Sequence, residues 1–445
     1  MTQGLLSGML VVDSTDGRGE LCARILADLG ADVVKVEPPG GASSRQHPPF
    51  APDGTSLSFA VRNTNKASVV LDLDDAAGRD DLHRLLARAD VWVESSRPGD
   101  LAARDLDHAA VVGRHPHLVL TSITDFGLTG PYRDHVATDD VLVALAGVLC
   151  RSGVPGRPPL LPPGSMAHDV ASTTAAFATL AACWQRRRTG RGQHVDLSVL
   201  EALAQTTDWS LPNWSVYGGS GGTGGQVRSG SGPVYPLYPC ADGYVRLVVL
   251  SPRQWRAMRA WLGEPEHLQD SAWDQFLTRL TRADVLDPLY RELFADRTAA
   301  ELAAEAQERG IVMTPVLSPA QVLSVPHYRE RGTLVEAEVA AGVRGPLASG
   351  FFEVDGDRAG YRARAPRVGE HQDEVPGPRP PPGAARPRSG PPSRRTPSRI
   401  SGCSTSVTAG SGSRPGASSP STAPTSSRSS PVPTPTSSGR WPGAR

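Results

Sequence analysis

The sequence predicts an α/β protein that has a parallel β-sheet in its first half and a second, smaller α/β domain. Two observations carry this prediction. A strand–helix–strand order opens the chain, and residues 217–232 hold eight glycines in 16 residues before a block rich in helical patterns. Two parallel strands need a crossover connection, which is most often a helix, and a glycine run marks a flexible boundary between domains.

The opening unit is read from its apolar residues. Residues 9–13 form a short apolar run that predicts a buried strand, and residues 32–37 predict a second one. Between them, Leu21, Ile25 and Leu29 recur at helical spacing and predict an amphipathic helix with these three side chains on one face.

Other elements follow from the same patterns. Further strands are expected at 67–73, 91–94 and 118–123, and helices at 80–89, 139–149, 167–187 and 195–204. After the glycine run, strands are expected at 244–250 and 312–316, and helices at 253–262, 271–281, 284–294, 299–309 and 319–325, before loop and strand at 342–375.

Charge and cysteine usage narrow the function classes. The 445 residues contain 46 basic and 46 acidic side chains, and this balance argues against nucleic-acid and membrane-surface partners. Apolar runs are too short for a membrane span, and no signal peptide is expected. The five cysteines are odd in number and widely spaced, so we expect no disulfide framework, no metal site and a cytoplasmic location.

Residues 376–445 differ from the rest, because they contain ten Arg and no Asp, Glu or Lys. Such a Pro/Ser/Arg composition predicts a disordered tail. A second hypothesis is that the tail is the frameshifted start of a second copy of the N-terminal domain. When residues 418–430 are back-translated with chosen, mostly GC-rich codons and read two bases later, they give a close match to residues 26–37, and the Thr, Pro and Ala codons fix two of their three bases whatever the choice. The gene sequence decides, since the hypothesis fails if no such frame overlaps the tail.

Two short motifs could carry chemistry. Gly17-Arg18-Gly19 follows the first strand and Glu37 ends the second, which is a weak dinucleotide-binding pattern because Cys22 stands at its third glycine. This leaves a nicotinamide oxidoreductase as an alternative. Asp169, preceded by His168, opens a predicted helix, where the helix dipole stabilises a carboxylate anion. An ordinary role in capping the helix stays open for Asp169.

Seven sequence blocks together resemble one family, the class III CoA-transferases (CaiB/BaiF), which includes formyl-CoA transferases and α-methylacyl-CoA racemases. The resemblance runs from about Gly8 to Val375. The blocks are LADLGADVVKVEPPGG at 26–41, N-x-N-K-x-S-V-x-L-D-L at 63–73, ADVWVESSRPG at 89–99, SITDFGLTGPY at 122–132, D-x-L-x-A-L-A-G at 140–147, TGRGQHVDLS at 189–198 and APRVGEHQDEV at 365–375.

The resemblance implies a Rossmann-like large domain built from both ends of the chain, with a small domain between two long linkers. It also implies a homodimer of two interlocked subunits. The expected divisions are 1–211 for the first part of the large domain, 212–233 for the glycine-rich linker, 234–325 for the small domain, and 326–375 for a linker and the return to the large domain.

For chemistry, the resemblance implies an acyl-CoA and a small carboxylic acid as substrates, with coenzyme A as a substrate and no cofactor. Asp169 would be the nucleophile and would form an aspartyl mixed anhydride. A glycine loop of Gly224, Gly225 and Gln226 would close over the site. The CoA-binding residues implied are Arg18, Gly19, Lys35, Leu71, Asp72, Ser95, Ser96, Arg97, Arg104 and Asp140.

Departures from the family pattern keep alternatives open. Glu20 and Asp125 add negative charge where CoA phosphates are expected, and Ser95 and Ser96 replace an asparagine and an aromatic residue. An α-methylacyl-CoA racemase would need a histidine base at Asp139. The remaining alternative is a non-catalytic or decayed half of a two-copy CoA-transferase.

Overall fold

The structure is a computed structural model that describes residues 4–154, 156–207, 212, 215–216 and 235–374. The chain divides into two units, and all described residues belong to the first, Met1–Pro381. The predicted glycine loop, including Gly224, Gly225 and Gln226, and the predicted tail at 376–445 lie outside the described residues.

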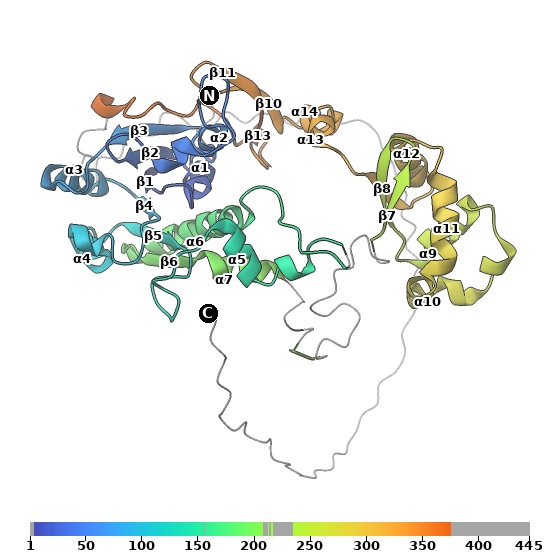
Figure 1. Cartoon of the computed structure of the whole chain (residues 1–445). Coiled ribbons are helices and arrows are strands. Elements are labelled where there is room, and N and C mark those ends of the chain that lie inside the picture. Colours follow the sequence, from blue (N-terminus) through green and yellow to red (C-terminus); the bar gives the residue numbers. More distant parts are fainter. Residues whose placement is uncertain (1–3, 155, 208–211, 213–214, 217–234, 375–445) are drawn as a thin grey trace, which may run out of the picture. The chain divides into compact units, whose positions relative to one another are not determined.

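A six-stranded parallel sheet organises the first half of the chain, which confirms the predicted α/β class (Figure 1). The strand order is β3-β2-β1-β4-β5-β6, the arrangement of a doubly wound Rossmann-like sheet. The strands are β1 (Leu10–Ser14), β2 (Asp32–Glu37), β3 (Lys66–Val70), β4 (Val91–Glu94), β5 (Val119–Thr124) and β6 (His194–Ser198).

Helices cover this sheet on two faces. Successive strand residues point to opposite faces, so Val11 belongs to one hydrophobic cluster and Val12 to another. The first cluster takes its helical side chains from α1 (Glu20–Asp28), α5 (Asp139–Leu145), α6 (Met166–Thr189) and α7 (Val199–Ala204), and the second from α3 (Ala76–Leu86) and α4 (His108–Arg114). Burial on both faces explains why the strands read as continuous apolar runs.

The helix predicted at 195–204 is wrong in its first half. Residues His194–Ser198 form β6, which pairs in parallel with β5, and only Val199–Ala204 is helical. The Ser198 side chain ends the strand and begins the helix, because its hydroxyl accepts a hydrogen bond from the Glu201 backbone at 3.2 Å. Neighbouring β5 therefore overrides a helical pattern that is present in the sequence.

The C-terminal part of the described chain packs on the N-terminal half. A hairpin of β10 (Leu334–Ala340) and β11 (Val343–Ala348) shares a hydrophobic cluster with Phe59 of α2 (Leu57–Arg62). The backbone of His371 donates to Ser68 of β3 at 2.9 Å. The short hairpin β12 (Glu353–Val354) and β13 (Asp357–Arg358) precedes this contact. Both ends of the described chain thus build one body.

Residues 235–330 hold an antiparallel three-stranded sheet and a set of helices. The sheet order is β7-β8-β9, with β7 at Leu237–Cys240, β8 at Gly243–Val248 and β9 at Val312–Pro315. Its core contains Trp255, Tyr238 and Phe294. The helices are α9 (Pro252–Trp261), α10 (Phe276–Thr281), α11 (Ala283–Phe294), α12 (Ala299–Glu308), α13 (Pro319–Val322) and α14 (Pro326–Glu330).

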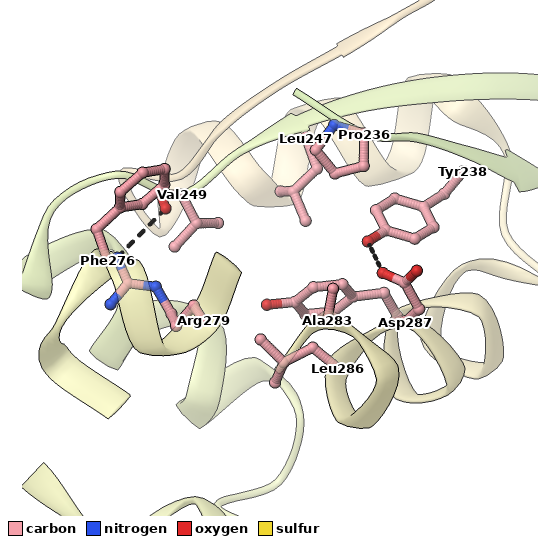
Figure 2. A pocket seen from close by; sticks show the side chains of 10 residues that line it. Pro236, Tyr238, Leu247, Val249, Phe276, Arg279, Ala283, Leu286 and Asp287 are labelled. Atoms are coloured by element: carbon pink, nitrogen blue, oxygen red, sulfur yellow. Dashed lines mark hydrogen bonds between the residues drawn. The ribbon is translucent and has the colours of Figure 1, made fainter. Parts of the chain in front are cut away.

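A cavity of about 40 Å³ lies inside this smaller α/β region (Figure 2). The Tyr238 hydroxyl donates to Asp287 at 2.6 Å on one side, and the Arg279 guanidinium donates to the Val249 carbonyl on the other. A volume of this size holds about one or two water molecules. It is a packing cavity and is too small for a thioester substrate.

The chain contains only two lysines, Lys35 and Lys66, and the structure buries both in the parallel sheet. The Lys66 ammonium donates to Asp13 at 2.7 Å, and the Lys35 ammonium pairs with Glu20 at 3.1 Å. Burial alone would raise the pKa of Asp13, but Lys66 and Lys35 outweigh it and hold that pKa below its ordinary value. These buried ion pairs join β3 to β1 and β2 to α1.

Candidate active site

The carboxyl ends of the parallel strands gather most of the predicted residues. Arg18 and Gly19 follow β1, Ser95 and Ser96 follow β4, and Asp125 follows β5. In a doubly wound sheet this edge, beside the point where the strand order reverses, is where ligands bind. Here the order reverses between β1 and β4, and the two loops meet where the Asp16 backbone donates to the Ser95 hydroxyl at 3.0 Å.

Asp169 lies in the first turn of α6, as the sequence predicts for the residue that opens this helix. Its side chain is 42% exposed, and Arg62 at the end of α2 pairs with it. One amino group of the Arg62 guanidinium contacts both carboxylate oxygens, at 2.9 and 3.2 Å. The carboxylate therefore faces solvent on one side and a cation on the other.

Arg62 is the site residue that sequence reasoning missed. It lies 107 positions from Asp169, and no spacing along one element joins the two residues. Its position directly before the N-x-N-K block was the one available signal. The Ser58 hydroxyl, one turn earlier on α2, accepts a hydrogen bond from the other amino group at 2.8 Å and fixes the guanidinium.

His168 turns away from the exposed side of Asp169. Its backbone donates to the Asp139 carboxylate at 2.9 Å, and its Nδ1 lies 3.8 Å from the same oxygen. Among the described residues, no group forms a hydrogen bond with the buried Nε2 atom. Burial lowers the pKa of His168 and outweighs the effect of Asp139. An enclosed Nε2 offers no base to a substrate, so the racemase alternative gains no support from His168.

The negative charges expected to repel CoA phosphates are internally paired. The Arg18 guanidinium forms a salt bridge with Asp125 and also donates to the Ser95 carbonyl at 3.0 Å. Glu20 is buried between Lys35 and the Ser44 hydroxyl, which donates to it at 2.7 Å. Glu20 and Asp125 thus each have a cation beside them that offsets their negative charge.

The glycine after Arg18 has a structural reason. Gly19 has a φ of +89°, in the left-handed region that favours glycine. A Cβ atom there would lie 2.9 Å from the Ile123 side chain. Any other residue would be strained at this φ, and the Ile123 side chain would also have to shift, so the turn favours glycine whatever ligand binds.

Not every predicted CoA residue reaches the surface. Lys35 is fully buried and donates to the Thr15 carbonyl at 2.8 Å, and Leu71 is buried beside β3. Gly19 and Ser95 are buried as well, within the loops at the strand ends. Five others lie at the surface or close to it. These are Asp72, which caps the Asp74 backbone, Ser96, whose backbone donates to Glu94, the exposed Arg97, Arg104, whose side chain pairs with Asp74, and Asp140, which is exposed on α5.

Glu37 is not available as the ribose-binding acid of a dinucleotide site. Glu37 is buried, and its carboxylate accepts hydrogen bonds from Arg45 at 2.6 Å, from Ser68 at 2.5 Å and from the Ala42 backbone at 3.0 Å. These contacts occupy the carboxylate that a ribose would need. Glu37 instead joins the second strand to the loop that follows it.

A second cavity of the described chain is not lined by Asp169. A cavity of about 610 Å³ is lined by the N-terminal segment and the chain around Tyr361, away from the strand ends described above. Within the described residues, no group of three or more His, Cys, Asp or Glu side chains could hold a metal ion. No helix in the described ranges is long and apolar enough to cross a membrane.

The strand order defines a Rossmann-like α/β protein, and an exposed carboxylate lies in the first turn of its helix α6. The sequence pattern of CoA-transferase family III matches residues 6–372. The chain belongs to this family. The predicted resemblance is therefore confirmed.

A solved structure and a curated relative support the same family. A CaiB/BaiF family protein from Brucella suis superposes with a TM-score of 0.74 at 27% identity, over 84% of this chain and 99% of that one. A subunit of succinyl-CoA:(R)-benzylsuccinate CoA-transferase from Thauera aromatica is 31% identical, over 82% of this chain and 92% of that protein.

A third relative is longer than this chain. A protein of Mycobacterium tuberculosis named as a probable CoA-transferase is 42% identical over 374 residues, which is 82% of this chain and 47% of the relative. The chain thus spans about half the length of that protein.

Proposed function

We propose that the protein is an acyl-CoA:carboxylate CoA-transferase in which Asp169 carries the acyl group. Family membership supports the reaction class, and relatives are named for transfer from succinyl-CoA and from acetyl-CoA to small acids. The observation that carries the proposal is the half-exposed Asp169 carboxylate in the first turn of α6, held by Arg62. The helix dipole favours the anionic form that a nucleophile needs.

In the proposed reaction, an Asp169 oxygen attacks the thioester carbonyl carbon. The carbon–sulfur bond breaks, and CoA leaves as a thiolate with the electron pair, which gives a mixed anhydride. The thiolate then attacks the Asp169 carbonyl carbon and releases the donor acid, so that an aspartyl-CoA thioester forms. An acceptor carboxylate then attacks the aspartyl-CoA thioester, and the same steps in reverse give the new acyl-CoA. Each intermediate keeps its acyl group activated.

The CoA moiety is proposed to bind at the carboxyl edge of the sheet. Gly19, Ser95, Ser96 and the exposed Arg97 line the loops that meet there. Arg104 and Asp72 lie near the next loop, and Asp140 lies on α5. Lys35 and Leu71 would support these loops from below, because both are buried. The glycine loop at Gly224, Gly225 and Gln226 belongs to the proposal as a cover for the site.

Trapping tests the nucleophile. The protein is incubated with succinyl-CoA or acetyl-CoA in the presence of hydroxylamine, and its peptides are then examined by mass spectrometry. We expect a hydroxamate on Asp169, and we expect Asp169→Asn to lose it together with about a thousandfold or more in transfer rate.

Asp284→Asn is the matched control, since Asp284 also lies in the first turn of a helix, α11, beside an arginine. This variant should keep the adduct. A wild-type protein that is acylated at another residue, or at none with either thioester, contradicts the proposal.

A second candidate is one half of a two-copy enzyme that depends on its other half for activity. The observation that favours it is the longer Mycobacterium tuberculosis relative, of which this chain matches 47%. In that case the chain would bind a CoA thioester but transfer its acyl group only after a second copy is supplied.

We also propose a homodimer in the cytoplasm. Phe177 and Trp184, two turns apart on α6, are 75% and 65% exposed, and such exposed aromatic residues are typical of an interface. Cys22, Cys183 and Cys240 are free thiols, which fits a reducing compartment. Light scattering that gives the mass of a single chain would contradict the dimer.

A further inference from the structure

Arg62 and Asp169 form an ion pair whose charge balance must change during the proposed reaction, and this inference rests on that proposed function. The Arg62 side chain is 20% exposed, less than the 42% of Asp169. The cation therefore lies on the protein side of the carboxylate. Its second amino group is fixed by Ser58 at 2.8 Å, so the guanidinium stays in place when its partner reacts.

Acylation removes the negative charge of Asp169, because the attacking oxygen becomes part of an anhydride and later the carboxyl group becomes a thioester. Arg62 then faces a neutral group. Two other acids act on His168, the residue before Asp169, and both are already engaged, since Asp125 pairs with Arg18 and Asp139 accepts from the His168 backbone. A partly buried cation without a counter-ion is costly, so the site at this stage favours an anion from solution.

We propose that Arg62 is the carboxylate-binding residue of the transfer step, and that it exchanges the Asp169 carboxylate for that of the substrate acid. It would first hold the donor carboxylate as it leaves the anhydride. It would then hold the acceptor carboxylate while one of its oxygens attacks the aspartyl-CoA carbonyl carbon, the carbon–sulfur bond breaks and the thiolate departs. The ligand class is a small carboxylate anion.

The charge state after acylation can be imitated without any reaction. Asp169→Asn keeps the size of the side chain and removes its charge, so Arg62 is left unpaired. Oxalate, succinate and acetate are the probes, and their affinity is measured by calorimetry or by ligand-observed NMR. We expect Asp169→Asn to bind at least one of them about tenfold more tightly than wild type, because a repelling charge is gone.

Two double variants test whether Arg62 causes this gain in carboxylate affinity. Asp169→Asn/Arg62→Gln should lose it, whereas Asp169→Asn/Arg84→Gln should keep it, since Arg84 is a 76% exposed arginine on α3. Thermal unfolding establishes that each variant is folded. No gain in Asp169→Asn, or a gain that persists without Arg62, overturns the proposal.

This outcome is separate from that of the trapping experiment. A wild-type chain that traps no acyl group contradicts the nucleophile, while carboxylate binding can still depend on Arg62. With an active substrate pair, Arg62→Gln should raise KM for the acceptor acid about tenfold and KM for the thioester much less. An equal rise in both constants would contradict a specific role toward the acid.

Discussion

The Arg18 guanidinium is bound to the Asp125 carboxylate across the ends of β1 and β5. Asp125 adds a negative charge to the family pattern, and its ion pair with Arg18 cancels that charge. The pair places a neutral surface where a free arginine would attract phosphates. It therefore joins two strand ends and also reduces the positive potential at the proposed CoA site.

Asp125→Asn should release the charge of Arg18. Because the freed guanidinium can attract CoA phosphates, we expect KM for the thioester to fall about threefold to tenfold at low ionic strength and to return toward wild type at high salt. Steady-state kinetics at two salt concentrations measure this. Asp284→Asn, in α11, should leave KM unchanged. A KM that rises in Asp125→Asn would show that the pair itself is needed for binding.

Lys66→Met should destabilise the fold, because it leaves the buried Asp13 carboxylate without its closest cation. Breaking one side of a buried pair costs about 3–5 kcal/mol. Urea unfolding gives the free energy. The double variant Asp13→Asn/Lys66→Met should recover part of the loss. If the double variant is as unstable as the single one, the cost comes from packing and not from the unpaired charge.

His115 should make stability depend on pH. The pKa of His115 is lowered from an ordinary 6.5 to about 4. Burial is the largest cause, and the neighbouring His83, His117 and Arg114 lower the pKa further. The contribution of neutral His115 to the free energy of unfolding is thus fully present above pH 6.5. It is lost as pH falls toward 4, because the unfolded chain binds the proton more readily than the folded one. The difference amounts to at most about 3 kcal/mol.

Urea unfolding at pH 7 and pH 4.5 tests this dependence on wild type and on His115→Gln. The variant should lose less stability than wild type between the two pH values. Since other groups titrate in both proteins, the comparison isolates His115. Identical losses would show that the pKa of His115 is not lowered in the native state.

Sequence patterns predicted the sheet well and its helices less completely. The parallel strands were predictable because both faces are buried and the apolar runs are continuous. The first helix was placed correctly, but its core face is not the one expected: Cys22 and Leu26 are fully buried, whereas Leu21 and Ile25 are only partly covered. Small and sulfur-containing residues pack closely on a sheet, and a count of large apolar residues overlooks them.

The site could be predicted only in part. Asp169 was proposed from the family resemblance and from its place at the start of a helix, which is local information, and its role stays a prediction. Arg62 was not, because its contact with Asp169 joins α2 to α6 and depends on the assembled fold. The burial of Lys35 was also beyond local reasoning, since its partner Glu20 lies on the helix that follows another strand. Contacts between distant elements decide which charges stay available for a ligand.

The enclosure of both lysines has a practical outcome for chemical labelling. An N-hydroxysuccinimide ester needs an accessible amine, and Lys35 and Lys66 offer none in the native fold. Both lysines should then be modified only after denaturation. A native sample that gains label at either lysine would reveal opening of the sheet, so this reagent also serves as a probe of transient unfolding.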